Sequence, residues 1–206
     1  MSHLRSDIRQ RCVDVLALYP QARSAMLPLL HLAQEQDGYL SDEGIAEVAE
    51  LTNTTPADVR GTASFYDMFH LEPVGKYVVS VCTNIACLLA GGEELLEHAG
   101  ATLGCSVGGT SDDGLFTLEE AECLADCDIA PCVQVNHRYV RSATAASFDA
   151  MVDELRAGRL DHDVPSHGTL VRVRRSVGLR APQAEVVEQR AQAREARAAR
   201  TPKEEK

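Results

Sequence analysis

Seven cysteines carry the most reactive chemistry in this sequence of 206 residues, and four of them form two closely spaced pairs. Four residues separate Cys82 from Cys87, and three separate Cys123 from Cys127. Both pairs are predicted to lie on loops at strand ends, where the backbone can curl around a ligand. Two pairs of thiolates can hold the two irons of a [2Fe–2S] cluster, two thiolates to each iron. Small neighbouring residues also let backbone N–H groups approach the sulfurs.

Spacing alone leaves three interpretations of these cysteines open, of which the [2Fe–2S] cluster is favoured. Four thiolates also satisfy zinc, but structural zinc ligands usually stand about two to four residues apart on tight knuckles. The four-residue gap between Cys82 and Cys87 fits that pattern less well, and no His lies inside either pair. Buried thiols without any metal are the third interpretation. A Rieske centre would need two histidine ligands near the cysteines, and a thioredoxin-type dithiol would need a C-x-x-C motif that the sequence lacks.

No other motif indicates a second type of chemistry. The pairs Gly91-Gly92 and Gly108-Gly109 belong to neither of the common phosphate-binding motifs, so no nucleotide site is expected in this chain. The seven histidines show no metal-like spacing, and no Ser/His/Asp order or paired carboxylates indicate hydrolysis. We therefore expect no catalytic residues here, and we do not expect the isolated chain to be an enzyme.

Charge is distributed unevenly along the chain, whose net charge is -11. Residues 1–160 contain 10 Lys and Arg against 24 Asp and Glu, a net charge of -14, whereas residues 161–206 contain 10 against 7, a net charge of +3. An acidic body excludes nucleic acid as the expected partner, because phosphates require a basic surface. The same charge is compatible with docking on a basic protein.

No apolar run approaches the ~18 to 20 residues that a membrane helix requires, and the first residues lack the apolar core of a secretory signal. We therefore expect a cytoplasmic protein with no direct membrane insertion. Thiols stay reduced in that compartment, which disfavours disulfides and favours metal or cluster ligation.

The first part of the chain, residues 1–72, shows the pattern of a small helical bundle. One helix is predicted to end at Tyr19-Pro20, a second to run from an N-cap at Ser24 to Gly38, and two more to begin after Ser41 and Thr55. The bundle is predicted to end in four apolar residues that pack on the next domain: Phe65, Tyr66, Met68 and Phe69.

A second domain, residues 73–160, is predicted to be mixed α/β, so the expected fold class is α+β. Its predicted order is a strand at 77–81, a helix at 91–99 that ends before Gly100, a strand at 115–118, a hairpin of 132–135 with 139–140, and a helix capped by Thr144. The helix after Cys87 is expected to point its first N–H groups toward a cluster. Residues 161–206 are expected to form an extended or partly helical charged tail.

A resemblance to a known family covers about residues 10–157. It rests on an ordered series of motifs: Gln34-Glu-Gln-Asp-Gly-Tyr39, Thr62-Ala-Ser-Phe-Tyr-Asp-Met-Phe69, Pro73-Val-Gly-Lys-Tyr77, Val81-Cys-Thr-Asn84, Gly91-Gly-Glu-Glu-Leu95, and Thr117-Leu-Glu-Glu120 with Glu122-Cys123. With this series the chain closely resembles the E, or 24 kDa-type, subunit of respiratory NADH:quinone oxidoreductase (complex I).

The resemblance implies a helical bundle followed by a thioredoxin-like [2Fe–2S] ferredoxin domain, with Cys82, Cys87, Cys123 and Cys127 as ligands of one cluster. It implies a subunit of an oxidoreductase and translocase, whose cluster exchanges one electron with the FMN of a partner flavoprotein that oxidises NADH. Other peripheral-arm subunits of complex I would be further partners. The chain would then lie on the cytoplasmic side of the membrane, attached through the complex.

Two alternatives stay open at this point. One is the equivalent diaphorase subunit of an NAD-linked hydrogenase or formate dehydrogenase, and the other is a zinc-stabilised thioredoxin-like interaction module. Cys132 departs from the family pattern, in which Ala-Pro precedes an ordinary apolar residue. We expect a buried strand residue there, while a spare thiol that can replace Cys127 is the sharper hypothesis. Cys12 and Cys105 are expected to be structural.

Overall fold

The computed structural model describes residues 3–168, so most of the expected tail lies outside the described residues. The helices of the first part are α1 (Ser6–Leu16), the 3-10 turn η1 (Ala22–Ala25), α2 (Met26–Asp37), α3 (Asp42–Thr52) and α4 (Pro56–Phe65). The second part consists of β1 (Tyr77–Cys82), α5 (Ile85–Leu88), α6 (Gly92–Leu103), β2 (Phe116–Ala121), η2 (Cys127–Ile129), β3 (Val133–Val135), β4 (Arg138–Val140) and α7 (Ala145–Arg156). The expected α+β fold, with a helical bundle first, is confirmed.

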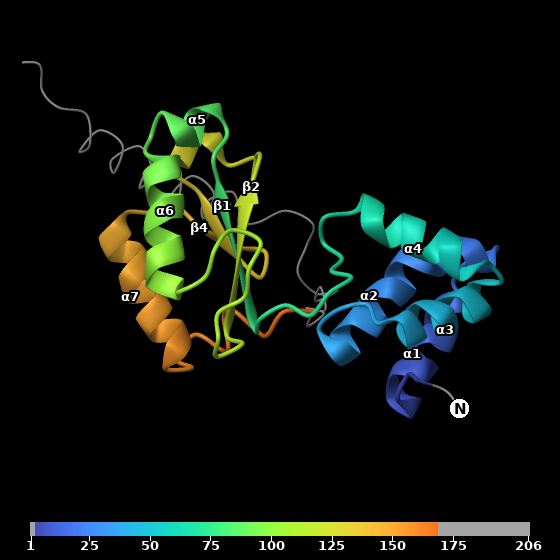
Figure 1. Cartoon of the computed structure of the whole chain (residues 1–206). Coiled ribbons are helices and arrows are strands. Elements are labelled where there is room, and N and C mark those ends of the chain that lie inside the picture. Colours follow the sequence, from blue (N-terminus) through green and yellow to red (C-terminus); the bar gives the residue numbers. More distant parts are fainter. Residues whose placement is uncertain (1–2, 169–206) are drawn as a thin grey trace, which may run out of the picture.

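The sheet has the strand order β2-β1-β3-β4 and is covered on one side by α6 and α7, while the helical bundle lies on its other side (Figure 1). β1 pairs in parallel with β2 and antiparallel with β3, which continues into β4 through the predicted hairpin. Alternate residues of β1 face the helices, because successive strand side chains point to opposite faces. Tyr77, Val79 and Val81 thus join the core under α6 and α7.

Most helix ends agree with local signals in the amino-acid sequence. Ser41 caps α3, Thr55 and Thr144 form capping boxes at α4 and α7, and Gly38 ends α2 with a φ of 79°. The predicted cap at Ser24 is wrong: that residue lies inside η1, and the residue that precedes α2 is Ala25, which has no side-chain cap to offer.

Two other predictions, the end of the helix after Cys87 and the packing of Phe65, are also wrong. The helix expected at 91–99 continues through Gly100 to Leu103 and ends at Gly104, whose φ is 75°. Gly100 suits the interior of α6 because a Cβ at this position would stand only 3.3 Å from the Cys105 carbonyl oxygen. Phe65, expected to pack, is 80% exposed at the end of α4, although Phe69 is buried.

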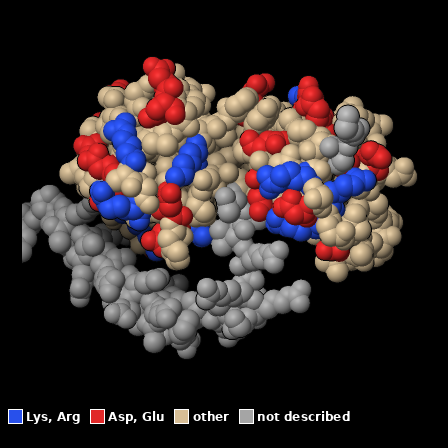
Figure 2. Space-filling view, turned by 90° about the horizontal axis from the view of Figure 1, so that it is seen from below, with Lys and Arg blue, Asp and Glu red and all other residues tan. Residues whose placement is uncertain are grey.

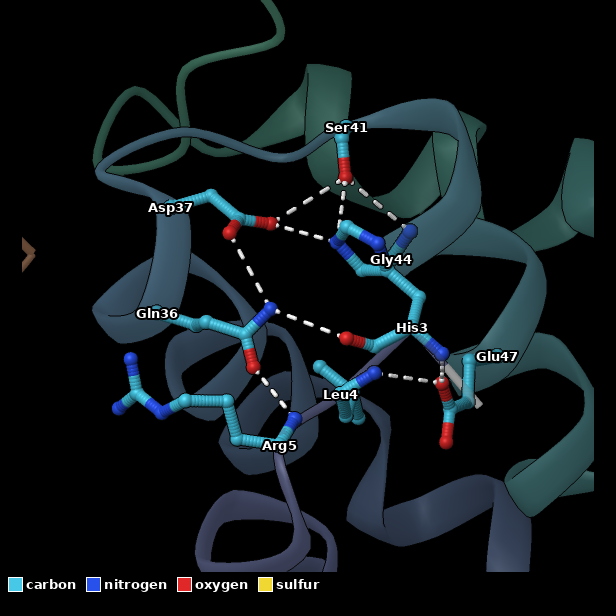
Figure 3. Close-up of polar contacts among 8 residues, drawn as sticks. All are labelled: His3, Leu4, Arg5, Gln36, Asp37, Ser41, Gly44 and Glu47. Atoms are coloured by element: carbon cyan, nitrogen blue, oxygen red, sulfur yellow. Dashed lines mark hydrogen bonds and ion pairs between the residues drawn. The ribbon is translucent and has the colours of Figure 1, made fainter. Parts of the chain in front are cut away.

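The N-terminal segment is fixed to the bundle by a buried carboxylate on α3 (Figure 3). Glu47 is 7% exposed and accepts the backbone N–H groups of His3 and Leu4, each at 2.8 Å. Its other oxygen accepts a hydrogen bond from Arg9 at 2.9 Å. A buried carboxylate costs free energy unless such partners are present, so these contacts hold the segment before α1 in place.

We expect Glu47→Ala to lower the free energy of unfolding by about 2 to 4 kcal/mol, because two backbone donors and one guanidinium lose their acceptor. Urea denaturation measures the change. The matched control is Asp42→Ala, which removes the carboxylate of an exposed ion pair with Arg60 and should cost under about 1 kcal/mol. Equal losses in the two variants would contradict the buried role of Glu47.

Residues 161–168, which we call the strap, pack back onto the sheet after α7. The Asn136 side chain donates to the carbonyl oxygens of Lys76 and Pro165, at 2.9 and 2.8 Å. The backbone N–H of His167 donates to the same Lys76 carbonyl at 2.7 Å. The strap therefore belongs to the folded body, and a division of the chain at residues 72 and 160 remains a proposal.

Burial lowers the pKa of His167 to about 3, with a smaller contribution from the neighbouring His70 and His137. His167 is therefore neutral in the folded chain, whereas an unfolded chain takes up a proton below its ordinary pKa of about 6.5. The stability that this neutral imidazole contributes is present above pH 6.5 and is lost as the pH falls toward 3.

The native chain should lose stability between about pH 7 and pH 5.5, because unfolding lets His167 take up a proton. In His167→Gln this proton uptake is absent, so we expect the loss to be smaller by about 1 kcal/mol. Urea denaturation at the two pH values measures this difference. The control is His162→Gln, whose side chain is 97% exposed and should leave the pH dependence unchanged. An unaltered pH dependence in His167→Gln would remove this explanation.

Candidate cluster site

The two predicted cysteine pairs meet at one end of the sheet. β1 ends at Cys82, which stands in register with Ala121 at the end of β2. Because the two strands are parallel, the loop that carries Cys87 and the loop that carries Cys123 leave the sheet at the same end, where both strands have their carboxyl ends. Cys82 and Cys87 are buried, whereas Cys123 and Cys127 are exposed.

Within each pair the thiols are in contact. Burial, followed by a hydrogen bond with the Cys82 thiol, raises the pKa of Cys87 to about 11. A hydrogen bond with the Cys123 thiol raises the pKa of Cys127. Cys127 also interacts electrostatically with both Cys82 and Cys87, which shows that the two pairs approach one another. Cys87 and Cys127 are therefore protonated without a metal, and binding one would release their protons.

The backbone around the buried pair is closely packed. A Cβ on Gly92 would lie 2.7 Å from the Cys82 carbonyl oxygen and 2.9 Å from the Cys87 carbonyl group, so only glycine fits at the start of α6. The backbone N–H of Cys132 donates to the Cys87 sulfur and opposes the rise of its pKa. Such N–H donors stabilise negatively charged sulfur, as an iron–sulfur cluster requires.

The expected helix directly after Cys87 is wrong. Cys87 lies inside the short α5, which begins after Asn84, and α6 starts only at Gly92. The amide near its sulfur comes instead from Cys132, distant along the chain. In the sequence, only Gly91-Gly92 indicated that two stretches of backbone approach each other closely at this point.

The exposed pair is held by contacts from the β4 hairpin. The Tyr139 hydroxyl donates to the Leu124 carbonyl at 2.8 Å, and Arg141 donates to the Asp126 carboxylate at 2.6 Å. The N–H of Ala125 points at the Cys123 sulfur at 3.4 Å, with Ala125 in the left-handed conformation. These contacts shape the loop, and sequence spacing could not reveal them.

The donor set fits a binuclear cluster better than a single ion. Four thiols occur as two contacting pairs, which supplies two ligands for each of two irons. Within residues 3–168, no group of three or more His, Cys, Asp or Glu side chains lies close enough together to hold a metal ion, so the two cysteine pairs approach one another without forming one closed site. Assigning the four cysteines as cluster ligands therefore rests on their convergence and on the N–H donors around them.

Cys132 lies inside the same cluster of side chains. It is buried against Cys82 and Cys87, and burial together with the charge of Asp126 raises the pKa of its thiol to about 12. The position is compatible with the expected buried residue at the start of β3. It also places a fifth thiol beside the two buried cysteines, Cys82 and Cys87.

The N-terminal network of Figure 3 brings a serine, a histidine and an aspartate together, but not as a catalytic triad. The Nε2 atom of His3 contacts both Asp37, at 2.7 Å, and Ser41, at 3.1 Å. A triad needs opposite ring nitrogens for these two partners. Ser41 also accepts the Gly44 N–H as the cap of α3, so the network is structural.

The chain is similar to several known proteins. The family model for thioredoxin-like [2Fe–2S] ferredoxin matches residues 12–156. The chain is 42% identical over 149 residues to NADH-quinone oxidoreductase subunit 2 of Thermus thermophilus, covering 71% of this chain and 82% of that protein. It is 39% identical over 150 residues to an E-type subunit of the NADH-quinone oxidoreductase of Rhizobium meliloti, covering 73% of this chain and 89% of that protein.

One solved structure is also similar, a crystal structure of NAD+-reducing [NiFe]-hydrogenase in the H2-reduced state. Its TM-score is 0.59 at 26% identity, and the match covers 65% of this chain. The match spans only 22% of the hydrogenase chain, so this chain corresponds to a part of that larger one.

We expect Cys132→Ala and Cys87→Ala to differ in metal content although each removes one buried thiol. Cys132→Ala keeps all four proposed ligands and should bind a full complement of iron and sulfide, with a loss of stability of about 1 kcal/mol. Cys87→Ala should lose most of its iron. Metal analysis after anaerobic purification separates the two, and loss of iron from Cys132→Ala would show that this thiol is a ligand.

The Cys127→Ala variant tests Cys132 as a spare thiol. If Cys132 replaces the missing ligand, this variant keeps a cluster with an altered absorption spectrum, and the Cys127→Ala, Cys132→Ala double variant does not. A Cys127→Ala chain without any cluster would refute the spare-thiol hypothesis.

Proposed function

Because the chain belongs to the thioredoxin-like [2Fe–2S] ferredoxin family, we propose that it is the electron-transfer subunit of an NADH:quinone oxidoreductase. The observation that carries this proposal is the convergence of Cys82, Cys87, Cys123 and Cys127 at one end of the sheet. In this role the chain exchanges one electron with the FMN of a partner subunit that oxidises NADH.

In this proposal the buried cysteines of the site hold the redox centre, and the exposed cysteines present it to solvent. When bound, a [2Fe–2S] cluster supplies a one-electron redox centre. Cys82 and Cys87 anchor it against the body of the protein, and the N–H of Cys132 stabilises charge on sulfur. Cys123 and Cys127 present its outer side to solvent, where a partner can approach.

The partner must supply the nucleotide and flavin sites. The sequence contains no nucleotide-binding fingerprint, so we assign FMN and NADH to a flavoprotein subunit that positions them for hydride transfer. None of the helices within residues 3–168 is long and apolar enough to cross a membrane. In this proposal the chain is attached to the cytoplasmic side of a membrane through other peripheral-arm subunits.

A second candidate is supported by the similar hydrogenase structure. A chain of that NAD+-reducing enzyme contains a part with this fold, so the same module can serve a diaphorase unit. The two candidates share the cluster and the flavin partner and differ in the enzyme that the diaphorase feeds. A zinc-stabilised interaction module remains the alternative without electron transfer.

We expect the chain, purified anaerobically, to be brown, to contain about two iron and two sulfide per chain, and to give an EPR signal when reduced. NADH should reduce this centre only when the neighbouring flavoprotein is present, because the chain alone has no hydride acceptor. EPR with metal analysis on the chain alone and with the flavoprotein checks both statements. A colourless chain that contains zinc would overturn the proposal.

The other subunits that bind this chain and its flavoprotein partner identify the enzyme to which the two belong. Co-purification with quinone-reducing subunits, and NADH-dependent quinone reduction, support the first candidate. Co-purification with a hydrogenase or formate dehydrogenase subunit supports the second.

A further inference from the structure

Between the open face of the sheet and the helical bundle lies a hollow of about 800 Å³, which we call the acidic cleft. Four carboxylate residues line it: Asp67 after α4, Glu119 and Glu120 in β2, and Glu122 directly after β2. Its volume lies within the range of about 300 to 1,000 Å³ that ligand sites occupy. Cys123 also lines the hollow, so the acidic cleft extends to the proposed cluster site.

Two carboxylates approach each other from opposite walls of the cleft. Asp67 belongs to the bundle side and Glu119 to the sheet side. Burial raises the pKa of the Glu119 carboxyl, and the negative charge of Asp67 raises it further. The two groups are therefore close enough to repel each other, and a cation placed between them would relieve this repulsion.

The lining provides no basic side chain to balance this charge. Among the described residues that form the cleft there is neither Lys nor Arg. The Nδ1 atom of His70 lies 3.6 Å from the Glu119 carboxylate, but burial lowers the pKa of His70, so near pH 7 this ring is mostly neutral. On the face of the molecule in Figure 2, by contrast, Lys and Arg are interspersed with acidic residues.

His167 adds a buried polar atom that lacks a partner. The residue is 8% exposed and lines the cleft, and its Nε2 atom makes no hydrogen bond within the described chain. Its ring packs edge-on against His70, with 4.6 Å between the ring centroids, so it lies beside the wall that Glu119 forms. Buried polar atoms are nearly always satisfied in folded proteins, so this one indicates a group outside the described residues. A neutral imidazole has one accepting nitrogen, which an N–H donor can satisfy.

We propose that a basic segment of the partner flavoprotein binds in the acidic cleft, with a lysine or arginine side chain between Asp67 and Glu119. The identity of this partner rests on the proposed function. An arginine suits the cleft best, because its guanidinium group presents five N–H donors to carboxylates on two walls. Since the cleft extends to Cys123, the same contact brings the flavoprotein to the exposed side of the cluster site.

The test uses the full chain with Asp67→Asn and Glu119→Gln, which keep the size of both side chains and an acceptor for the Ser80 hydroxyl. Isothermal titration calorimetry measures binding to the flavoprotein. At low salt we expect binding to become about tenfold weaker, because the cation of the partner loses both carboxylates. The difference should shrink in high salt, which screens the attraction in the native chain. Unchanged binding overturns the proposal.

The matched control is Glu97→Gln with Asp153→Asn, which removes two negative charges from exposed positions of α6 and α7 on the other side of the sheet. It should bind the flavoprotein within about twofold of the native chain. Equal weakening in the two variants would show that net charge alone steers association, and the acidic cleft would then have no special role.

Hydrogen exchange followed by mass spectrometry locates the contact. The flavoprotein should slow exchange in peptides that contain Asp67 or Glu119 in the native chain, and it should slow them less in the Asp67→Asn, Glu119→Gln variant. Protection confined to other peptides contradicts docking in the cleft. If the free variant already exchanges faster at these peptides than the free native chain, the chain itself fills the cleft and the proposal fails.

A probe that needs no flavoprotein separates this inference from the proposed function. Hexa-arginine amide should shift the NMR signals of the His70 and His167 rings in the native chain and in the control, and should bind the Asp67→Asn, Glu119→Gln variant about tenfold more weakly. A native chain that binds iron and the flavoprotein but not this peptide overturns the cleft as a cation site. Absence of iron refutes the proposed function, whereas the peptide still decides whether the cleft binds a cation.

Discussion

The parallel pairing of β1 with β2 is the constraint on which the rest of the site depends. In this register Cys82 stands beside Ala121, so the loops after the two strands leave the sheet at the same end. A slip by one residue would turn the core-facing residues of β2 toward the bundle. Register is fixed because Phe116 and Leu118 are fully buried under α6 and α7, where each such side chain contributes about 1.5 to 3 kcal/mol.

The two faces of the sheet consequently serve different purposes. The face under α6 and α7 is apolar and supplies the stability that holds the cysteine loops in place. The opposite face presents Val78, Ser80 and Glu119 toward the bundle, and the resulting space is lined by polar and titratable groups. The apolar face that stabilises the fold and the polar face that carries titratable groups are thus the two sides of one sheet. Both faces extend to the proposed cluster site at its end.

Helix caps and turns were predictable from the sequence, whereas the approach of the two cysteine pairs was not. Caps such as Ser41 and Thr144, and the hairpin turn at Asn136-His137, depend on neighbouring residues only, and the structure agrees. The predictions at Ser24 and Gly100 failed because a capping residue or a glycine does not by itself fix a helix end: Ser24 lies inside η1, and α6 continues through Gly100 to Leu103. Spacing could identify two cysteine pairs, but it could not show that they approach each other, because this depends on the register between β1 and β2.

The two cysteine pairs differ in environment in a way that suits electron exchange. Burial makes charge costly around Cys82 and Cys87, as the raised pKa of Cys87 shows, whereas water can stabilise charge around the exposed Cys123 and Cys127. With each pair holding one iron, as proposed, added negative charge is better accommodated on the exposed side. That side is also the one a partner can reach, so in the proposed role Cys123 and Cys127 would present the redox centre to the partner while Cys82 and Cys87 would keep it attached.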